Sequence, residues 1–130
     1  MLNILYFADP NTVHDIKWIE FFTKRELCKA YLICRPHQYK QYLETPGLID
    51  QCKASNILVM KPVKYLSIKN WIATIKGVRY IDSVIRKNEI ALIHVMYAEP
   101  NALWALFKFV FRIPMLLTTR GTDILYTIPN

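Results

Sequence analysis

Residues 91–123 constrain the fold more than any other stretch, because they read as strand, helix and strand in succession. An apolar run at 91–96 is bounded on both sides, and Pro100 suits the first turn of the helical segment that follows. Residues 102–112 combine helical spacing with an apolar character all round, and a second apolar run lies at 115–119. This order predicts one βαβ unit with a right-handed crossover.

The rest of the chain repeats this alternation. Further strands are expected at 2–8, 30–34 and 56–60, and further helices at 15–26, 37–44 and 67–88. Residues 37–55 are the least legible part, because proline and glycine at 46 and 47 interrupt them. The alternation predicts an α/β Rossmann-like fold, a three-layer αβα sandwich around a parallel sheet of about five strands in the order 3-2-1-4-5. We expect residues 1–130 to form this single domain.

Two helices have apolar residues at helical spacing. In the longest, Ser67 is the expected N-cap, and the inward face comprises Ile68, Trp71, Ile72, Ile75, Val78, Ile81 and Ile85. In the helix at 102–112, the inward face is expected to comprise Leu103, Leu106, Phe107 and Val110. Trp104 and Phe111 then fall on the outer side with Lys108. Such an outer face suits either a membrane surface or a missing element of the fold, and the second interpretation is the plainer one.

Composition bounds the environment and the partners. Seventeen Lys and Arg against ten Asp and Glu give a formal charge of +7, which suits nucleic acid, an anionic membrane surface or phosphorylated substrates. We expect no nucleic acid, because the interleaved aromatic and basic pattern of single-strand binders is missing. Three cysteines without C-x-x-C spacing favour a reducing compartment. With neither a signal peptide nor a spanning segment, the chain is expected to be cytoplasmic, or peripheral at the inner face of the membrane.

Polar side chains gather where the expected strands end. Parallel strands point their carboxyl ends at one edge, and ligands of open α/β sheets bind there, at the switch point between strands one and four. The candidate substrate-binding residues on these loops are Asn11, Thr12, His14, His94, Tyr97, Arg120, Gly121, Thr122 and Asp123. The alternative is that loops are polar in any α/β domain. Each of three residues also has a structural alternative. His94 could be a buried histidine hydrogen-bonded to the backbone, His14 could simply flank the start of a helix, and Gly121 could supply a backbone conformation that other residues resist.

Several kinds of site are excluded. The chain has three glycines, at 47, 77 and 121, so neither G-x-G-x-x-G nor a P-loop can exist. No serine lies in a nucleophile elbow, and the histidines at 14, 37 and 94 lack metal-ligand spacing. We therefore expect no metal and no cofactor, and the catalytic residues are unknown from the sequence.

The motifs together resemble one family. Four of them lie in the last third of the chain: IALIHVMYA at 90–98, Pro100, Ile113-Pro114 and LTTRGTDI at 117–124. The fifth is the first loop, DPNTVHDIKW at 9–18, which is similar to a variant first turn "P-N-S-x-H" followed by tryptophan. In this order and spacing they resemble the N-terminal domain of group 1 (family 4) glycosyltransferases. The resemblance covers almost the whole chain but only about the first third of a typical member.

The resemblance implies a retaining, metal-independent glycosyltransferase of GT-B architecture. In such enzymes the N-terminal domain mostly receives the acceptor, and a C-terminal domain binds the nucleotide-sugar. Of the candidate residues, Asn11, Thr12, His14, His94 and the turn at 120–123 would line the cleft. Arg120 stands where many members have histidine, and an arginine binds an anion bidentately but is no general base at neutral pH. The chain ends at Asn130 without a donor-binding half, so we expect it to be inactive alone.

The resemblance leaves three further expectations. The nucleotide-sugar and the acceptor, a glycan or a lipid-linked sugar, are the partners of the full-length enzyme, and apolar and basic helical surfaces can contact membranes in such proteins. Residues 115–119 form an uncovered edge strand, which predicts self-association. The alternative to a transferase is a non-catalytic Rossmann-like module that binds an anionic ligand. The reading frame beyond codon 130 distinguishes the two.

Overall fold

The sheet topology agrees with the prediction. The structure is a computed structural model that describes residues 1–64, 68–96 and 101–118. The elements are β1 (Leu2–Phe7), α1 (Val13–Thr23), β2 (Cys28–Ile33), α2 (Pro36–Leu43), α3 (Pro46–Ala54), β3 (Ile57–Val59), the 3₁₀ turn η1 (Ile68–Asn70), α4 (Trp71–Lys87), β4 (Leu92–Val95), the 3₁₀ helix η2 (Asn101–Phe107), α5 (Lys108–Phe111) and β5 (Met115–Leu117). The strands are parallel, in the order β3-β2-β1-β4-β5, which confirms the expected order.

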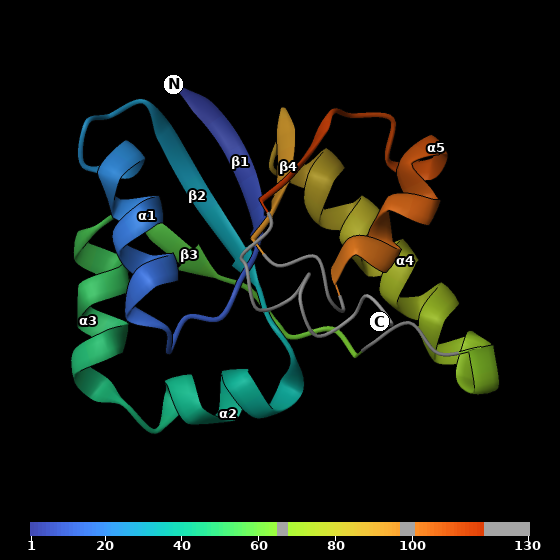
Figure 1. Cartoon of the computed structure of the whole chain (residues 1–130), viewed down its shortest axis with the longest axis horizontal. Helices are drawn as coiled ribbons and strands as arrows, with labels where there is room; N and C mark the ends of the chain where they lie inside the picture. The colour runs from blue at the N-terminus through green and yellow to red at the C-terminus, as the bar shows by residue number, and fades with distance from the viewer. Residues whose placement is uncertain (65–67, 97–100, 119–130) are drawn as a thin grey trace, which may run out of the picture.

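Helices cover both faces of this sheet, as Figure 1 shows, with α1 and α3 on one side and α4 and α5 on the other. Alternate residues of β1 point to opposite faces. Leu5 and Phe7 enter a core with α4, whereas Tyr6, and Ala8 just after the strand, enter a core with α1. Burial on both faces is why the strands read as continuous apolar runs rather than as alternating ones.

One helix escaped the sequence analysis. Residues 46–54, to which the sequence analysis assigned no element, form α3. Pro46 occupies a first-turn position of that helix, where its missing N–H costs nothing, so it starts a helix rather than only ending one. Cys52 is its fully buried residue and packs in the α1 core.

Glu20 joins α1 to α3. The residue is 8% exposed, and its carboxylate accepts hydrogen bonds from Ser55 Oγ (2.6 Å) and Gln51 Nε2 (3.0 Å), while Lys24 Nζ lies 3.3 Å away. Burial raises the pKa of Glu20, but the hydrogen bonds from Ser55, Gln51 and Lys24 outweigh it and leave the pKa below its ordinary value. A buried carboxylate is stabilised only when it is paired in this way.

The inward face expected for residues 102–112 is wrong for Leu106 and Val110, whereas Phe107 packs against the core as expected. Trp104 and Phe111 are buried, at 4% and 2% exposure, whereas Leu106 and Val110 are 72% and 44% exposed. The first part of the segment is 3₁₀ rather than α-helical, so residues three apart align and a different stripe turns inward. The Trp104 indole stacks on Phe7, with ring centroids 5.7 Å apart, and buries more apolar surface than a leucine would.

Gly77 in the middle of α4 makes room for this indole. A Cβ at this position would lie 3.1 Å from Val63 Cγ1 and 3.4 Å from Trp104 Cη2. The lack of a side chain therefore allows the close approach of η2 and of the chain after β3 to α4.

The apolar face expected for the longest helix is buried along part of its length. Val78, Ile81 and Ile85 are buried, but Trp71, Ile72 and Ile75 are 65%, 65% and 38% exposed. The first turns of α4 extend beyond the sheet that they were expected to cover (Figure 1). The observed N-cap is Asn70, whose side chain accepts a hydrogen bond from the Ala73 N–H (3.3 Å), and Ser67 lies outside the described residues.

Candidate functional site

The loop after β1 is the best-defined part of the carboxyl edge of the sheet. The Asp9 carboxylate accepts hydrogen bonds from the backbone N–H (3.0 Å) and the side-chain amide (2.9 Å) of Asn11. The Asp9 N–H in turn donates to Asp15 Oδ2 (3.0 Å), and the Thr12 N–H donates to the Asp9 carbonyl (3.2 Å). Asp15 is fully buried in the first turn of α1, where the helix dipole favours a negative charge. These bonds fix the turn that leads from β1 into α1.

Asn11 also joins this loop to the next one. Its amide donates to the Gln38 carbonyl (2.9 Å) in α2, the helix that follows β2. Among the described residues, the buried Asn11 Oδ1 has no hydrogen-bond partner. An unpaired buried acceptor is costly, so it marks a position that a water or a ligand hydroxyl can satisfy. Asn11 was predicted from the sequence, whereas Gln38 was missed because it lies in the least legible stretch.

His94 lies within β4 and is 4% exposed. Its Nε2 is 2.6 Å from Thr118 Oγ1, just beyond β5, and its ring contacts Tyr6 and Trp18 at centroid distances of 5.3 and 6.4 Å. Burial lowers the pKa of His94, so the imidazole is held neutral. The side chain therefore links β4 to the residue that follows β5 and contacts Tyr6 of β1 on the α1 face, under a half-exposed Trp18.

The remaining predicted residues fall into two groups. Thr12 occupies the N-cap position of α1 without a side-chain capping bond, and His14 is exposed in the first turn of that helix. The other predicted residues, Tyr97, Arg120, Gly121, Thr122 and Asp123, lie outside the described residues. Thus Asn11 and Thr12 share one turn, His94 is buried beneath Trp18 of α1, and His14 is exposed to solvent.

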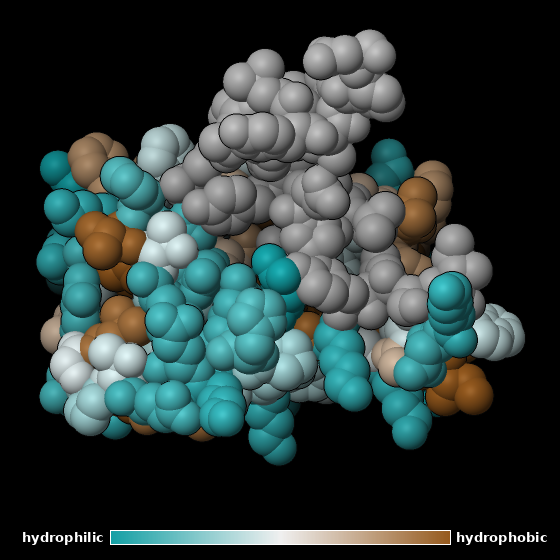
Figure 2. Space-filling model, turned by 60° about the horizontal axis from the view of Figure 1, so that its bottom comes forward, coloured by the Kyte–Doolittle hydropathy of each residue, from teal (hydrophilic) through white to brown (hydrophobic). Residues whose placement is uncertain are grey.

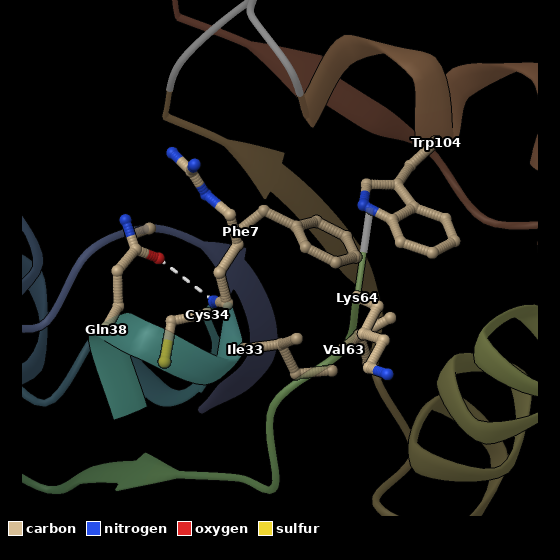
Figure 3. Close-up of a pocket in the computed structure, with 9 residues that line it drawn as sticks. Phe7, Ile33, Cys34, Gln38, Val63, Lys64 and Trp104 are labelled. Atoms are coloured by element: carbon tan, nitrogen blue, oxygen red, sulfur yellow. Dashed lines mark hydrogen bonds between the residues drawn. The ribbon is translucent and has the colours of Figure 1, made fainter. Parts of the chain in front are cut away.

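A small pocket opens at the same edge, on the α4 face. Phe7 and Cys34 come from the ends of β1 and β2, Lys64 follows β3, and Trp104 belongs to η2. Figure 3 shows Gln38 on one side of the pocket and Lys64 with Trp104 on the other, and the Phe7 ring points toward Trp104. Burial raises the pKa of the Cys34 thiol to about 12, so the thiol is neutral.

The described part of this edge offers hydrogen-bonding side chains. In the part of the chain that the structure describes, no cluster of three His, Cys, Asp or Glu side chains could hold a metal ion. No helix among these residues is long and apolar enough to cross a membrane. Asn11 and Thr12 can exchange hydrogen bonds with ligand hydroxyls, and the neutral His94 already has a partner. These groups do not form a catalytic set by themselves.

The sequence profile of the glycosyl transferase 4-like family matches residues 3–130. The chain belongs to this family. Its fold is similar to that of a glycosyltransferase from Rickettsia africae ESF-5, with a TM-score of 0.66 and 18% identity over 99% of this chain and 31% of that one. It is also similar to MurG from Acinetobacter baumannii, with a TM-score of 0.62 and 10% identity over 92% of this chain and 35% of that one. No curated protein matches the chain.

The glycosyl transferase 4-like chain thus spans about a third of the length of the two solved structures that it resembles. At these identities the similarity establishes the fold, which is Rossmann-like and of the GT-B type. The family match establishes a glycosyltransferase-type domain. The resemblance identified from the motifs at 9–18, 90–98 and 113–124 is therefore confirmed.

Proposed function

We propose that this glycosyl transferase 4-like chain is the acceptor-side, N-terminal domain of a retaining enzyme that transfers a sugar from a nucleotide-sugar to a glycan or a lipid-linked acceptor. The proposal rests on the family match over residues 3–130 together with the place of Asn11 and Thr12 at the carboxyl edge of the sheet. Residues 1–130 make one domain, and the donor is bound by a second half. The isolated domain is inactive.

Asn11, Thr12 and His94 are the described residues that we assign to the acceptor side. The unpaired Oδ1 of Asn11 accepts from an acceptor hydroxyl, and the Thr12 hydroxyl, which does not cap α1, donates or accepts beside it. His14, Tyr97 and residues 120–123 complete the proposed set. We assign no proton transfer to Arg120.

Nuclear magnetic resonance titration of the domain tests this assignment. A short-chain prenyl-diphosphate-linked N-acetylglucosamine should shift the amide signals of Asn11 and Thr12, while UDP-glucose and GDP-mannose should shift none. Thr12→Ala should weaken acceptor binding several-fold, and Ser83→Ala, which removes an exposed hydroxyl from α4, should not. Binding of a nucleotide-sugar at this edge, or the absence of binding by any acceptor, would overturn the proposal.

The gene sequence beyond codon 130 gives an independent test. A reading frame that continues into a second Rossmann-like half with an acidic pair supports the transferase. A natural stop codon supports the alternative, a binding module for an anionic ligand.

A second part of the proposal concerns the side of the molecule formed by α4, η2 and α5. Residues 68–88 and 101–112 contain seven Lys and Arg but one acidic residue. The whole chain has seventeen Lys and Arg and ten Asp and Glu, so this side is more basic than the rest. The same helices carry exposed apolar side chains, Trp71, Ile72, Leu106 and Phe109, at 65%, 65%, 72% and 79% exposure. The lower right of Figure 2 shows a hydrophobic group beside hydrophilic ones, where α4 begins in Figure 1.

Exposed aromatic and aliphatic side chains among basic ones suit an anionic bilayer, because the rings enter the interface while the cations meet lipid phosphates. We therefore assign this side to peripheral contact with the inner face of the membrane in the cytoplasm. A nucleic acid would use the cations but leave the apolar side chains exposed to water.

Vesicle sedimentation tests the membrane contact. The domain should bind vesicles with 30% phosphatidylglycerol and not pure phosphatidylcholine vesicles, and Leu106→Ser with Phe109→Ser should abolish binding. Leu43→Ser on α2 removes a similarly exposed leucine from the other side and serves as the control. Binding that survives the double substitution, or that RNA displaces while vesicles do not bind, would contradict the assignment.

The last part of the proposal is self-association through residues 115–119. Among the described residues, β5 pairs with β4 along one side, and Leu116 and Leu117 are 49% and 44% exposed. An uncovered edge strand with apolar side chains pairs readily with a second copy. Light scattering at rising concentration should show a dimer that Leu116→Lys reduces, and a monomer at every concentration would refute the pairing.

A further inference from the structure

The indole of Trp18 lies where helix α1 gives way to an exposed part of the sheet. On the α1 side, the strand register aligns Tyr6 of β1, His94 of β4 and Leu116 of β5 in one row. Helix α1 packs over β2 and β3, and Leu116 at the far end of the row is 49% exposed. Trp18 projects from α1 toward His94, with ring centroids 6.4 Å apart, and is itself 46% exposed. Its ring therefore lies at the switch point between β1 and β4, where ligands of such sheets bind.

Two aromatic neighbours hold this ring in place. His94 meets the indole at 77° and Phe22 at 60°, with the Phe22 centroid 6.0 Å away. Both rings are steeply tilted, so neither stacks flat on the indole. His94 is in turn fixed by Thr118 Oγ1, which lies 2.6 Å from its Nε2. A fixed aromatic side chain loses little conformational freedom when a ligand covers it, which favours binding.

Hydrogen-bonding side chains accompany the ring. His14 lies one turn before Trp18 on the same side of α1 and is exposed. The Thr118 hydroxyl can keep its bond to His94 and still exchange another with a ligand. A sugar ring has an apolar face of C–H groups and a rim of hydroxyls. The C–H groups suit the negative face of an indole, and the rim suits neighbouring polar side chains.

Phe21, which is also exposed in α1, differs from Trp18. The Arg25 guanidinium lies over the Phe21 ring, with Cζ 3.7 Å from the centroid. This cation–π contact already occupies one face of Phe21. The exposed aromatic residues Trp71 and Phe109 belong to the other side of the sheet, with α4 and α5 (Figure 1). Trp18 thus has a ring face to offer on the helix that directly follows the proposed acceptor loop.

We infer that Trp18 is a stacking platform for a sugar ring of the acceptor, and that Thr118 and His14 form hydrogen bonds with the hydroxyls of that ring. The inference rests on the proposed function, which supplies the acceptor. Trp18 lies roughly 9 Å along the axis of α1 from Thr12. Two linked sugar rings span such a distance, so one acceptor can contact the Asn11 loop with its terminal sugar and Trp18 with the next one. This makes the acceptor a glycan of at least two sugars, free or lipid-linked.

Nuclear magnetic resonance of the indole N–H groups tests this platform. Cellobiose, N,N′-diacetylchitobiose, lactose and mannobiose are titrated separately, and sorbitol serves as a control that has hydroxyls but no ring. At least one disaccharide should shift the Trp18 signal saturably, while the signal of the buried Trp104 stays in place. The C–H protons of the bound sugar should move upfield, because the ring current of the indole acts on protons above its face. A tryptophan with a merely structural role would not produce that upfield shift.

Two substitutions and a control assign the binding to Trp18. Trp18→Ala should weaken binding of the disaccharide roughly tenfold, which is the upper end of the effect expected for an aromatic contact. Trp18→Phe retains an aromatic face and should recover most of the affinity. Phe21→Ala removes a similarly exposed ring further along α1 and should leave binding unchanged. Thermal unfolding of each variant confirms that the domain still folds.

Several results would overturn the platform. They are the lack of a saturable shift with any of the four disaccharides, binding of sorbitol as tight as theirs, and an unchanged affinity in Trp18→Ala. A Trp18 signal that moves with protein concentration or with vesicles, and not with disaccharides, would also overturn it, because another copy or a bilayer would then cover the ring.

The outcomes also separate this inference from the proposed function. If prenyl-diphosphate-linked N-acetylglucosamine shifted Asn11 and Thr12 but no disaccharide reached Trp18, the acceptor-side assignment would stand without the platform. If disaccharides stacked on Trp18 but no acceptor shifted Asn11 and Thr12, the platform would remain and the glycosyl acceptor at that loop would be refuted.

Discussion

Replacing Trp104 with alanine is the sharpest test of how this domain is packed. The indole is 4% exposed and stacks on Phe7 with an interplanar angle of 14°. Its Cη2 atom lies 3.4 Å from the point that a Cβ would occupy at Gly77. It joins η2 to β1 and α4, three elements that are distant in sequence. Its removal should therefore destabilise the whole domain rather than one segment.

The magnitude follows from burial. An aromatic side chain of this size buries roughly 200 Å², which at about 25 cal/mol per Å² is about 5 kcal/mol as an upper limit. The methyl group of alanine retains a small part of this burial free energy. The cavity that remains and the lost stacking on Phe7 increase the loss of stability. We expect a loss of about 3–5 kcal/mol in the free energy of unfolding. For a domain of this size that corresponds to roughly 12–20 °C in Tm.

Urea unfolding followed by far-ultraviolet circular dichroism measures this loss without relying on tryptophan fluorescence. Leu106→Ala is the control, because Leu106 is 72% exposed in the same 3₁₀ helix and should cost less than about 0.5 kcal/mol. The amphipathic pattern of residues 102–112 predicts the opposite order. A larger loss for Leu106→Ala than for Trp104→Ala would refute the packing described above.

Three further outcomes are expected. Cys34 and the other two cysteines are buried, and burial raises the pKa of Cys34 to about 12, so no thiol should react with Ellman's reagent at pH 8 until denaturant is added; a rapid reaction of the native protein would contradict this. Because burial lowers the pKa of His94 below 6.5, its contribution to stability is present above pH 6.5 and is lost as the pH falls further, so His94→Gln should reduce the difference in urea midpoint between pH 7.5 and 5.5. The pKa of Glu20 is also lowered, so its contribution to stability is present above pH 4.5 and is lost as the pH falls through the pKa of the folded state. Glu20→Gln should therefore reduce the change in the free energy of unfolding between pH 6 and 3. An unchanged pH dependence would refute the pairing with Ser55.

The parallel sheet and its order were predictable because they depend on a pattern that is local and repeated. The apolar runs that became β1, β2 and β4 are bounded by polar or proline-containing turns, and alternation with helices admits few topologies. The boundaries shifted by a few residues. Asn11 and Thr12 were also predictable as edge residues, since they lie in the loop after β1.

Other parts of the site depended on contacts between distant segments. Nothing in residues 37–55 indicated that Gln38 would receive the Asn11 amide, because that bond joins two loops through the spacing of β1 and β2. The burial of His94 and its bond to Thr118 likewise required β5 beside β4 and α1 above them.

The sequence alone determined the alternation of strands and helices, the family and the edge at which we propose that ligands bind, because each depends on the order and spacing of residues along the chain. The tertiary structure decided which stripe of residues 104–111 turns inward and that Asn11 of the first loop contacts Gln38 of α2. Two stripes of similar hydrophobicity compete in that segment, and Trp104 turned inward where Gly77 leaves room for its ring. Such a choice depends on shape across the fold, which the spacing of apolar residues does not encode.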